Sequence, residues 1–489
     1  MNSAPAPAIR VLLMLSTTLM QRLCFLRPAA TGLSLLAVLF AFGVSPATAQ
    51  MQPPQDTTQV TFDEAVRTAL DRNTNIKRAQ AQARQSNVQV QSEWMDFAPD
   101  LSISSDVTRR VGRNFSQVTG DFTTQSTDFF NLNGRSSVTL FNGFENTASL
   151  REARERAGAD QTNLKRTQRE VVFTVMDQFI SLVESREIVR VRREQVEAQR
   201  KRLRQIEEFV EAGSRPTSDL YTAEADLADA EQQLLQGKRE REVSQTQLIQ
   251  TLQLNPRAAY DFQVPGLEED ALEPTQYELS ALIDEAFQER LDLRVAEAER
   301  RAAQQGIRSA RSSYYPTVSL GGNYGTDWSS SGIRGDVSDD FLNQLDLNRG
   351  GGLSLSISIP IFDRLQRSSQ VEQAQVQAQN AEYELEDQRQ EIALQVRQSY
   401  LDYRNAVQQL EAANKRLRAA ERARTAAQER YELGSADIVE LQNALRDYVD
   451  AASQQVRARY ELFFQQKRID YNAGRLSPSA PLLGAPADQ

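Results

Sequence analysis

Histidine is missing from the 489 residues of this chain, and cysteine occurs once, as Cys24. Because Cys24 lies in a segment that is expected to be cleaved off, the mature chain should contain neither residue type. This excludes disulfides, thiolate nucleophiles, Ser-His-Asp triads and nearly all ordinary zinc sites. The sequence also lacks a glycine-rich phosphate loop and any pair of acids whose spacing suggests a site. It therefore predicts no enzyme and no cofactor.

Long apolar runs are scarce, and the clearest one lies in the first 49 residues. Arg22 and Arg27 precede the apolar run 33–44, and Ala47-Thr48-Ala49 forms a small-x-small cleavage site. The run is too short to span a bilayer, so residues 1–49 are predicted to be a secretory signal peptide. The leader carries three arginines and no acid, so its removal makes the net charge of −10 more negative. Such an acidic surface predicts no nucleic-acid partner.

Glycine and proline are absent from residues 365–433, so nothing in this segment forces a helix to end. Apolar and small residues recur there at alternating steps of three and four. They are Val371, Ala374, Ala378, Ala381, Leu385, Ile392, Tyr403, Ala406, Leu410, Ala413, Leu417 and Ala420. The pattern predicts one long helix whose heptad seam packs closely on a partner helix.

The chain is internally duplicated. A shift of 221 residues places Gly213-Ser214 on Gly434-Ser435, and a shift of 217 places Pro99 on Pro316. The predicted organisation is a signal peptide (1–49), a first repeat (50–254), a linker or equatorial segment (255–278), a second repeat (279–474) and a disordered tail (475–489).

Both repeats have the same order of predicted elements. A helix comes first, at about 62–94 and again at 279–312. Two alternating segments of about ten residues follow, and the clearest is Leu353 to Ile361, where serines separate leucines and isoleucines. A long helix then leads to the Gly-Ser turn, and a second helix returns, at about 217–254 and 436–472.

Taken alone, the alternating segments fit a half-buried sheet on a soluble core equally well. Aromatic residues at their helix-side ends favour a membrane barrel instead. These interface residues are Phe97, Phe141, Tyr314, Tyr315 and Phe362. Four strands cannot close a barrel, and lipid does not tolerate an open sheet edge, so several chains must share one. The predicted fold is an α+β membrane protein in outer-membrane lipid. With three chains there would be twelve strands, and the long helices would form a bundle of matching symmetry.

The duplicated layout resembles the TolC-like outer-membrane efflux proteins over nearly all of 62–476. The tip sequence from Tyr431 to Ser435, followed by Glu440-Leu441, adds to the resemblance. This family implies a homotrimer with a twelve-stranded barrel and a long periplasmic α-helical coiled-coil tunnel. It also implies the outer-membrane channel of a tripartite efflux or type I secretion system. Its partners would be a periplasmic adaptor protein and an inner-membrane pump of the RND or ABC type. The cargo, whether drugs, metals or proteins, stays open.

The resemblance also implies a periplasmic gate. Glu440 falls at an acidic ring position, Asn443 at a second position that is usually acidic, and Tyr431 at a bridging tyrosine. Each could equally be an ordinary helix charge or seam residue. The gating arginine of the family falls at Ala436, and its counterpart in the first repeat is Arg215. We therefore expect Arg215 to supply the closing contact, to Glu440 or to Asp219.

The Gly-Ser tips have two expected roles. Gly213 and Gly434 should adopt a left-handed turn, as helix-ending glycines do. By the same resemblance, Ser214, Ser435 and Val439 are expected to contact the adaptor. Two rival interpretations remain: a trimeric adhesin-like stalk anchored by a shared barrel, and a soluble periplasmic coiled-coil scaffold.

Overall fold

A computed structural model describes residues 58–115, 120–263, 273–330 and 341–477. The signal peptide predicted at 1–49 and most of the tail predicted at 475–489 lie outside these residues. The described chain forms two compact units, and each draws on both repeats. One contains Ala98–Phe141 and Thr317–Ser358, and the other contains the helices outside these two ranges. No helix in the described part of the chain is long and apolar enough to cross a membrane.

The duplication extends to the ends of the helices. The first repeat contains α2 (Phe62–Arg72), α3 (Thr74–Met95), α4 (Glu145–Glu211) and α5 (Thr217–Thr251). The second contains α6 (Leu279–Glu289), α7 (Leu291–Ser312), α9 (Gln366–Glu432) and α10 (Ile438–Asn472). The bounds of α2 and α3 recur 217 residues later, and those of α4 and α5 recur 221 residues later.

The single helices predicted at 62–94 and 279–312 are wrong, because each is broken into two. Asn73 ends α2 and caps α3: its side-chain oxygen accepts from the backbone N–H of Asn75 at 2.9 Å, and its amide donates to the Thr251 carbonyl at 3.0 Å. Arg290 occupies the same place in the second repeat and pairs with Asp292. The Asn73 side chain thus satisfies a helix-end group at the first break, whereas Arg290 makes no side-chain cap in the described structure. Apolar periodicity reveals neither break.

Helix α9 has the length and the buried stripe that its sequence predicts. Leu385, Ile392, Tyr403 and Ala406 are at most 4% exposed, while the flanking positions are mainly solvent-exposed. Most of the small seam residues nearer the two ends are half-buried. The seam contacts α7 along one part of the helix and α10 along the other.

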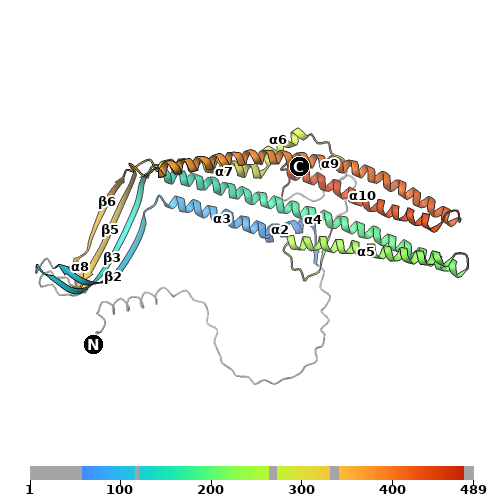
Figure 1. The fold of residues 1–489 in the computed structure, drawn as a ribbon, viewed down its shortest axis with the longest axis horizontal. Coiled ribbons are helices and arrows are strands. Elements are labelled where there is room, and N and C mark those ends of the chain that lie inside the picture. The colour runs from blue at the N-terminus through green and yellow to red at the C-terminus, as the bar shows by residue number, and fades with distance from the viewer. Residues whose placement is uncertain (1–57, 116–119, 264–272, 331–340, 478–489) are drawn as a thin grey trace, which may run out of the picture. The chain divides into compact units, whose positions relative to one another are not determined.

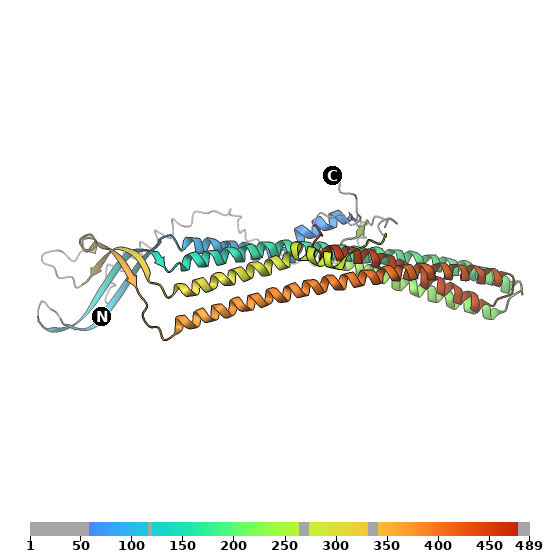
Figure 2. The ribbon, with the colours of Figure 1, turned by 90° about the horizontal axis from the view of Figure 1, so that it is seen from above.

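The helices of this unit form a layer in which α3, α4, α7 and α9 are successive neighbours (Figures 1 and 2). The hairpin partners α5 and α10 pack on α4 and α9. Helices α7 and α10 both contact α4 and α9, and they follow one another along that pair (Figure 2). Arg169 marks their meeting point, because its guanidinium donates to the carbonyls of Glu289 and Gly474 at 3.5 and 3.1 Å.

The largest apolar core lies where α2 packs on the middle of α4. Phe179 is fully buried there, between Phe62 and Phe262 at ring distances of 5.4 and 6.3 Å. Phe262 ends β4 (Tyr260–Phe262), which pairs in parallel with β1 (Thr58–Val60). The described part of the predicted linker is therefore packed on the helices.

The strand unit is one sheet in the order β2-β3-β5-β6. Its strands are β2 (Asp100–Phe115), β3 (Phe122–Asn142), β5 (Thr317–Ser329) and β6 (Gly350–Ser358). Strands β2 and β3 contain 16 and 21 residues, so the predicted length of about ten is wrong for the first repeat. The short helix α8 (Phe341–Leu347) precedes β6 and was not predicted (Figure 1).

Candidate functional site

The tips of the two helical hairpins have the same turn. The N–H of Ser214 donates to the Phe209 carbonyl at 2.9 Å, and the N–H of Gly213 donates to that of Val210 at 3.0 Å. The second tip repeats both bonds from Ser435 and Gly434. This is a Schellman motif, which requires a left-handed residue. Gly213 and Gly434 supply it with φ values of 69° and 71°.

Tyr431 connects the two hairpins. It lies at the end of α9, is 7% exposed, and packs in a small apolar core. The core draws on α4, α5, α9 and α10, through Ile206, Ala223, Ala427, Ile438 and Leu441. The tips of the first and second hairpins are therefore packed together within one chain.

Two arginines of the first hairpin lie over the ring of Tyr431. The guanidinium carbons of Arg202 and Arg215 are 4.6 and 4.4 Å from the ring centroid. Arg215 also donates to the Tyr431 carbonyl at 3.4 Å and pairs with Asp219 at 3.8 Å. Burial lowers the pKa of Arg202. A desolvated cation over an aromatic ring gains about 2 kcal/mol, so this cluster helps to hold the tips together.

The expected contact between Arg215 and Glu440 is absent from the described structure. Glu440 instead forms an ion pair with Arg430, across the turn of its own hairpin. Its backbone N–H donates to Asp437, which caps α10, at 2.8 Å. Of the two expected contacts of Arg215, the described structure therefore contains the one with Asp219 and not the one with Glu440.

A polar stripe continues from Glu440 along the exposed face of α10. Asn443, Asp447 and Asp450 are all exposed, and their spacing from Glu440 places them on one face of the helix. Glu440 and Asn443 were expected from the resemblance. Asp447 and Asp450 were missed, although their spacing of three and four residues could have revealed them. Val439, beside the turn, is 54% exposed.

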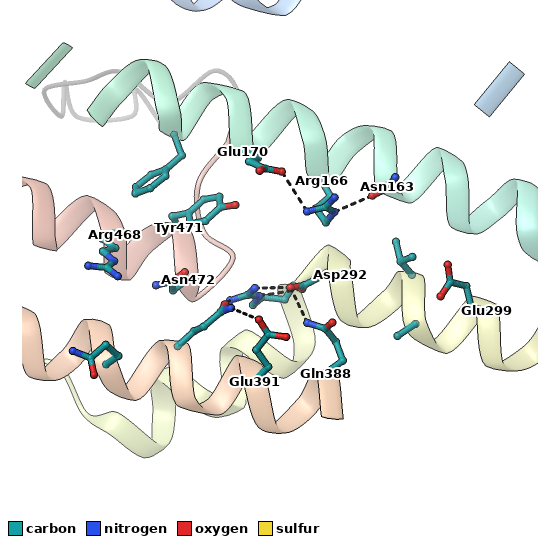
Figure 3. A pocket seen from close by; sticks show the side chains of 16 residues that line it. Asn163, Arg166, Glu170, Asp292, Glu299, Gln388, Glu391, Arg468, Tyr471 and Asn472 are labelled. Atoms are coloured by element: carbon teal, nitrogen blue, oxygen red, sulfur yellow. Dashed lines mark hydrogen bonds and ion pairs between the residues drawn. The ribbon is translucent and has the colours of Figure 1, made fainter. Parts of the chain in front are cut away.

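A second candidate is a polar pocket of about 670 Å³ between α4, α7, α9 and α10 (Figure 3). Arg166 reaches Glu170 at 3.3 Å, and Arg290 reaches Asp292 at 2.5 Å. Arg166 and Asp292 point into the space between the helices in Figure 3. The pocket lies where α7 begins and α10 ends.

The charges of this pocket largely satisfy one another. Arg290 also donates to Gln395 at 2.8 Å, and Arg468 pairs with Asp402 at 3.3 Å. Among the described residues, no group of acidic side chains is arranged to hold a metal ion. The pocket is best explained as a junction that compensates the polar ends of two helices.

The predicted interface aromatics are mostly exposed. Phe97, Tyr314 and Tyr315 are about half exposed and Phe362 is 80% exposed, whereas Phe141 is half-buried. Arg367 lies 5.8 Å from the ring of Tyr314. A place at the membrane interface stays a prediction for all five.

Comparison with known proteins identifies both repeats. The sequence matches the family described as "Outer membrane efflux protein" over residues 65–252 and 282–474. It is 26% identical to the outer membrane protein TolC of Salmonella enteritidis over 200 residues, which are 41% of this chain and 40% of TolC. This match therefore spans less than half the length of that relative.

Solved structures share the fold. The outer membrane protein VceC of Vibrio cholerae superposes with a TM-score of 0.72 at 15% identity, covering 84% of this chain and 96% of VceC. The CmeC outer membrane channel of Campylobacter jejuni gives 0.73 at 16% identity, covering 91% and 94%. The family match and the shared fold agree with the duplicated helices and strands. The chain therefore belongs to the outer membrane efflux protein family, as an outer-membrane channel protein whose helical part lies in the periplasm.

Proposed function

We propose that three copies of this chain share one twelve-stranded barrel and form an exit duct through the outer membrane. The sheet order leaves β2 and β6 at its edges, each hydrogen-bonded to one described strand only. Unpaired backbone groups cost several kcal/mol each in lipid, about as much as a whole hydrogen bond. Pairing β2 of one copy with β6 of the next satisfies both edges, and three copies close the ring.

Side chains of the edge strands suit a lipid environment. Leu101, Ile103, Val107 and Val111 lie on one face of β2 and are 52–78% exposed. Serines and other polar residues alternate with them along the strand. Apolar-out, polar-in alternation is typical of strands that line a water-filled membrane barrel.

The helical layer also has two edges that a neighbouring copy would cover. Helix α9, at one edge, exposes a row of large side chains: Val376, Tyr383, Leu394 and Leu401, at 47–59%. Helix α3, at the other edge, packs on α4 through one side and exposes Val88 at 57%. Joining α9 of one copy to α3 of the next buries these residues and closes the layer into a tunnel.

The periplasmic tips are proposed to receive cargo from a periplasmic adaptor and an inner-membrane pump of the RND or ABC type. Phe209, Leu433 and Val439 are 50–83% exposed around the two turns. Apolar side chains beside Ser214 and Ser435 suit the packing of an adaptor helical hairpin. The cargo class, drugs, other small molecules or proteins, would follow from the pump.

We further propose that the Tyr431 cluster holds the duct closed. The cluster ties the tips of the two hairpins together, so moving one hairpin outward requires the ring to leave Arg202 and Arg215. In the trimer, Glu440, Asp447 and Asp450 would repeat three times around the axis and favour cations.

Strands β2 and β6, each with one partner strand among the described residues, carry this proposal, and a planar bilayer tests it. The purified complex should have the mass of three chains and give discrete conductance steps. A complex that inserts without conducting would instead indicate the adhesin-like stalk. A water-soluble monomer would contradict both.

A further inference from the structure

A row of glycines crosses the apolar face of the sheet. Gly134 of β3, Gly322 of β5 and Gly351 of β6 occupy this face, where neighbouring positions carry leucine, isoleucine or tyrosine. Gly322 is paired with Leu353, and Gly351 with Tyr324. Because three side chains are missing between larger ones, the face is hollowed there. The result is a groove of about 950 Å³.

Helix α8 covers one part of this groove. Its Phe341 contacts Phe130 and Trp328 on the apolar face, at ring distances of 5.3 and 5.5 Å. The hydroxyl of Thr326 donates to the Leu345 carbonyl at 2.7 Å, and the Leu345 side chain lines the groove. The remaining walls are mainly apolar, through Leu101, Ile103, Leu132, Tyr324 and Leu353, and Arg135, Ser136 and Asn323 also line the groove.

A cation stands at one end of the groove. Arg349 lines it and directly precedes β6, and its guanidinium is fixed by Asp346, through the carbonyl and the carboxylate, at 2.9 Å each. The side chain remains 56% exposed, so it has N–H groups left for a further acceptor. Arginine matches a phosphate in geometry as well as in charge.

The length of β6 gives the depth of Arg349 in the membrane. Strand β6 has nine residues and leads directly toward α9, on the periplasmic side. Nine residues at the tilt of membrane strands rise about 20 Å, close to the ~25 Å apolar band of such barrels. Arg349 would therefore lie at the headgroup level of the outer leaflet, above an apolar groove.

On the basis of the proposed barrel, we infer that this groove binds an acyl chain of a phosphorylated glycolipid of the outer leaflet, whose phosphate contacts Arg349. Acyl chains match the apolar walls, and a pocket of this volume is large enough for a lipid fragment. The glycine row creates the space, α8 covers it, and Arg349 selects an anionic headgroup. Both leaflets offer acyl chains, but the position of Arg349 favours the outer one.

Native mass spectrometry of the purified complex, with lipid A or phosphatidylglycerol added in detergent, tests the inference. The wild type should retain up to one lipid A per chain and clearly less phosphatidylglycerol. Gly134→Leu should fill the groove, because a Cβ there meets its nearest atom only at 3.5 Å, and should lower lipid A retention about tenfold. Arg349→Gln should lower it several-fold, and Arg349→Lys less.

Gly112→Leu is the matched control. It makes the same change on the opposite face of β2, where no described atom lies within 4 Å of an added Cβ, and should retain lipid A normally. Equal retention by wild type and Gly134→Leu would overturn the inference, as would stronger binding of phosphatidylglycerol. Conductance of the same preparations separates the two hypotheses: a conducting complex without lipid A selectivity contradicts only the groove, whereas a complex that does not assemble contradicts the barrel.

Discussion

The two hairpins have the same backbone structure but different side chains at their tips. Their helices contain 67 and 35 residues in each repeat, and both tips end in a Gly-Ser Schellman turn. The side chains at the tips differ: Tyr431 corresponds to Val210, and Ala436 corresponds to Arg215. The shared glycines and seams determine how the hairpins are built. Tyr431 and Arg215, which are not conserved between the two tips, link one hairpin to the other.

The largest expected effect comes from removing Tyr431, because the equivalent position of the first hairpin has no tyrosine. Tyr431→Ala deletes a buried ring and its contacts with Arg202 and Arg215, a loss of about 3 kcal/mol. If the cluster holds the duct closed, single-channel conductance of the resting state should rise at least tenfold in a planar bilayer. The control is Val210→Ala at the equivalent place, which should change it little. Unchanged conductance in Tyr431→Ala would contradict the gate.

A smaller effect is expected from removing Arg215, because the equivalent position of the second hairpin is an alanine. Arg215→Gln removes one cation from the ring and the pair with Asp219, worth about 1–2 kcal/mol. Resting conductance should rise several-fold, and Arg215→Lys should restore part of the closure. An equal response of both variants would show that the charge of Arg215 is not involved.

The helix caps of the two tips differ as well. The Asp437 side chain accepts the Glu440 N–H, whereas Pro216, at the equivalent position, makes no side-chain cap in the described structure. Asp437→Ala should therefore destabilise the first turn of α10 by about 1 kcal/mol. Hydrogen exchange of this turn should become roughly fivefold faster, an increase that Pro216→Ala should not produce in α5. Equal protection in Asp437→Ala and wild type would exclude the cap.

One acid occurs at the same position in both hairpins, but its exposure to solvent differs between them. Asp447 is exposed on α10, while its counterpart Asp226 is largely buried and pairs with Arg446 at 3.5 Å. Asp447→Asn, which alters the proposed lumen, should lower the cation-to-anion permeability ratio by about twofold. Asp226→Asn should leave that ratio unchanged. If both variants changed the reversal potential equally, the proposal that the polar stripe of α10 lines the lumen would be contradicted.

The smallest expected effect is a pH dependence of stability at the end of α10, which the end of α5 should not show. Burial raises the pKa of Asp470, at the end of α10, and Ile249 occupies the equivalent place in α5. The folded state therefore binds the proton more tightly than the unfolded state. This contribution to stability is present below the ordinary carboxyl pKa and is lost as the pH rises through the raised value. Asp470→Asn should reduce the fall in Tm across that window, measured by thermal unfolding, and an unchanged fall would contradict the raised pKa.

The sequence predicted the elements that depend on local pattern. The seam of α9, the left-handed glycines at the tips and the repeat order follow from spacing that is visible in one chain. Matching the repeats also directed attention to Arg215, which the structure places on Tyr431. Arg202 could not be found this way, because it lies in a polar stretch of α4 and only tertiary packing brings it to the ring.

Other features depend on contacts that periodicity does not report. The break at Asn73 is a polar side-chain cap, and the break at Arg290 is accompanied by its ion pair with Asp292. The pairing of Glu440 with Arg430 depends on the geometry of the turn between them. Helix α8 is only seven residues long and lies beside the strands through ring contacts of Phe341.

Disulfide cross-linking between the two edge strands tests the shared barrel most directly. The only cysteine of the chain is Cys24, in the predicted leader, so engineered pairs report without interference. Cysteines are placed at alternate positions of β2 and β6, and the oxidised outer-membrane protein is separated under denaturing conditions. The account predicts that pairs in register yield covalent dimers and trimers. Chains that stay monomeric at every pairing would contradict it.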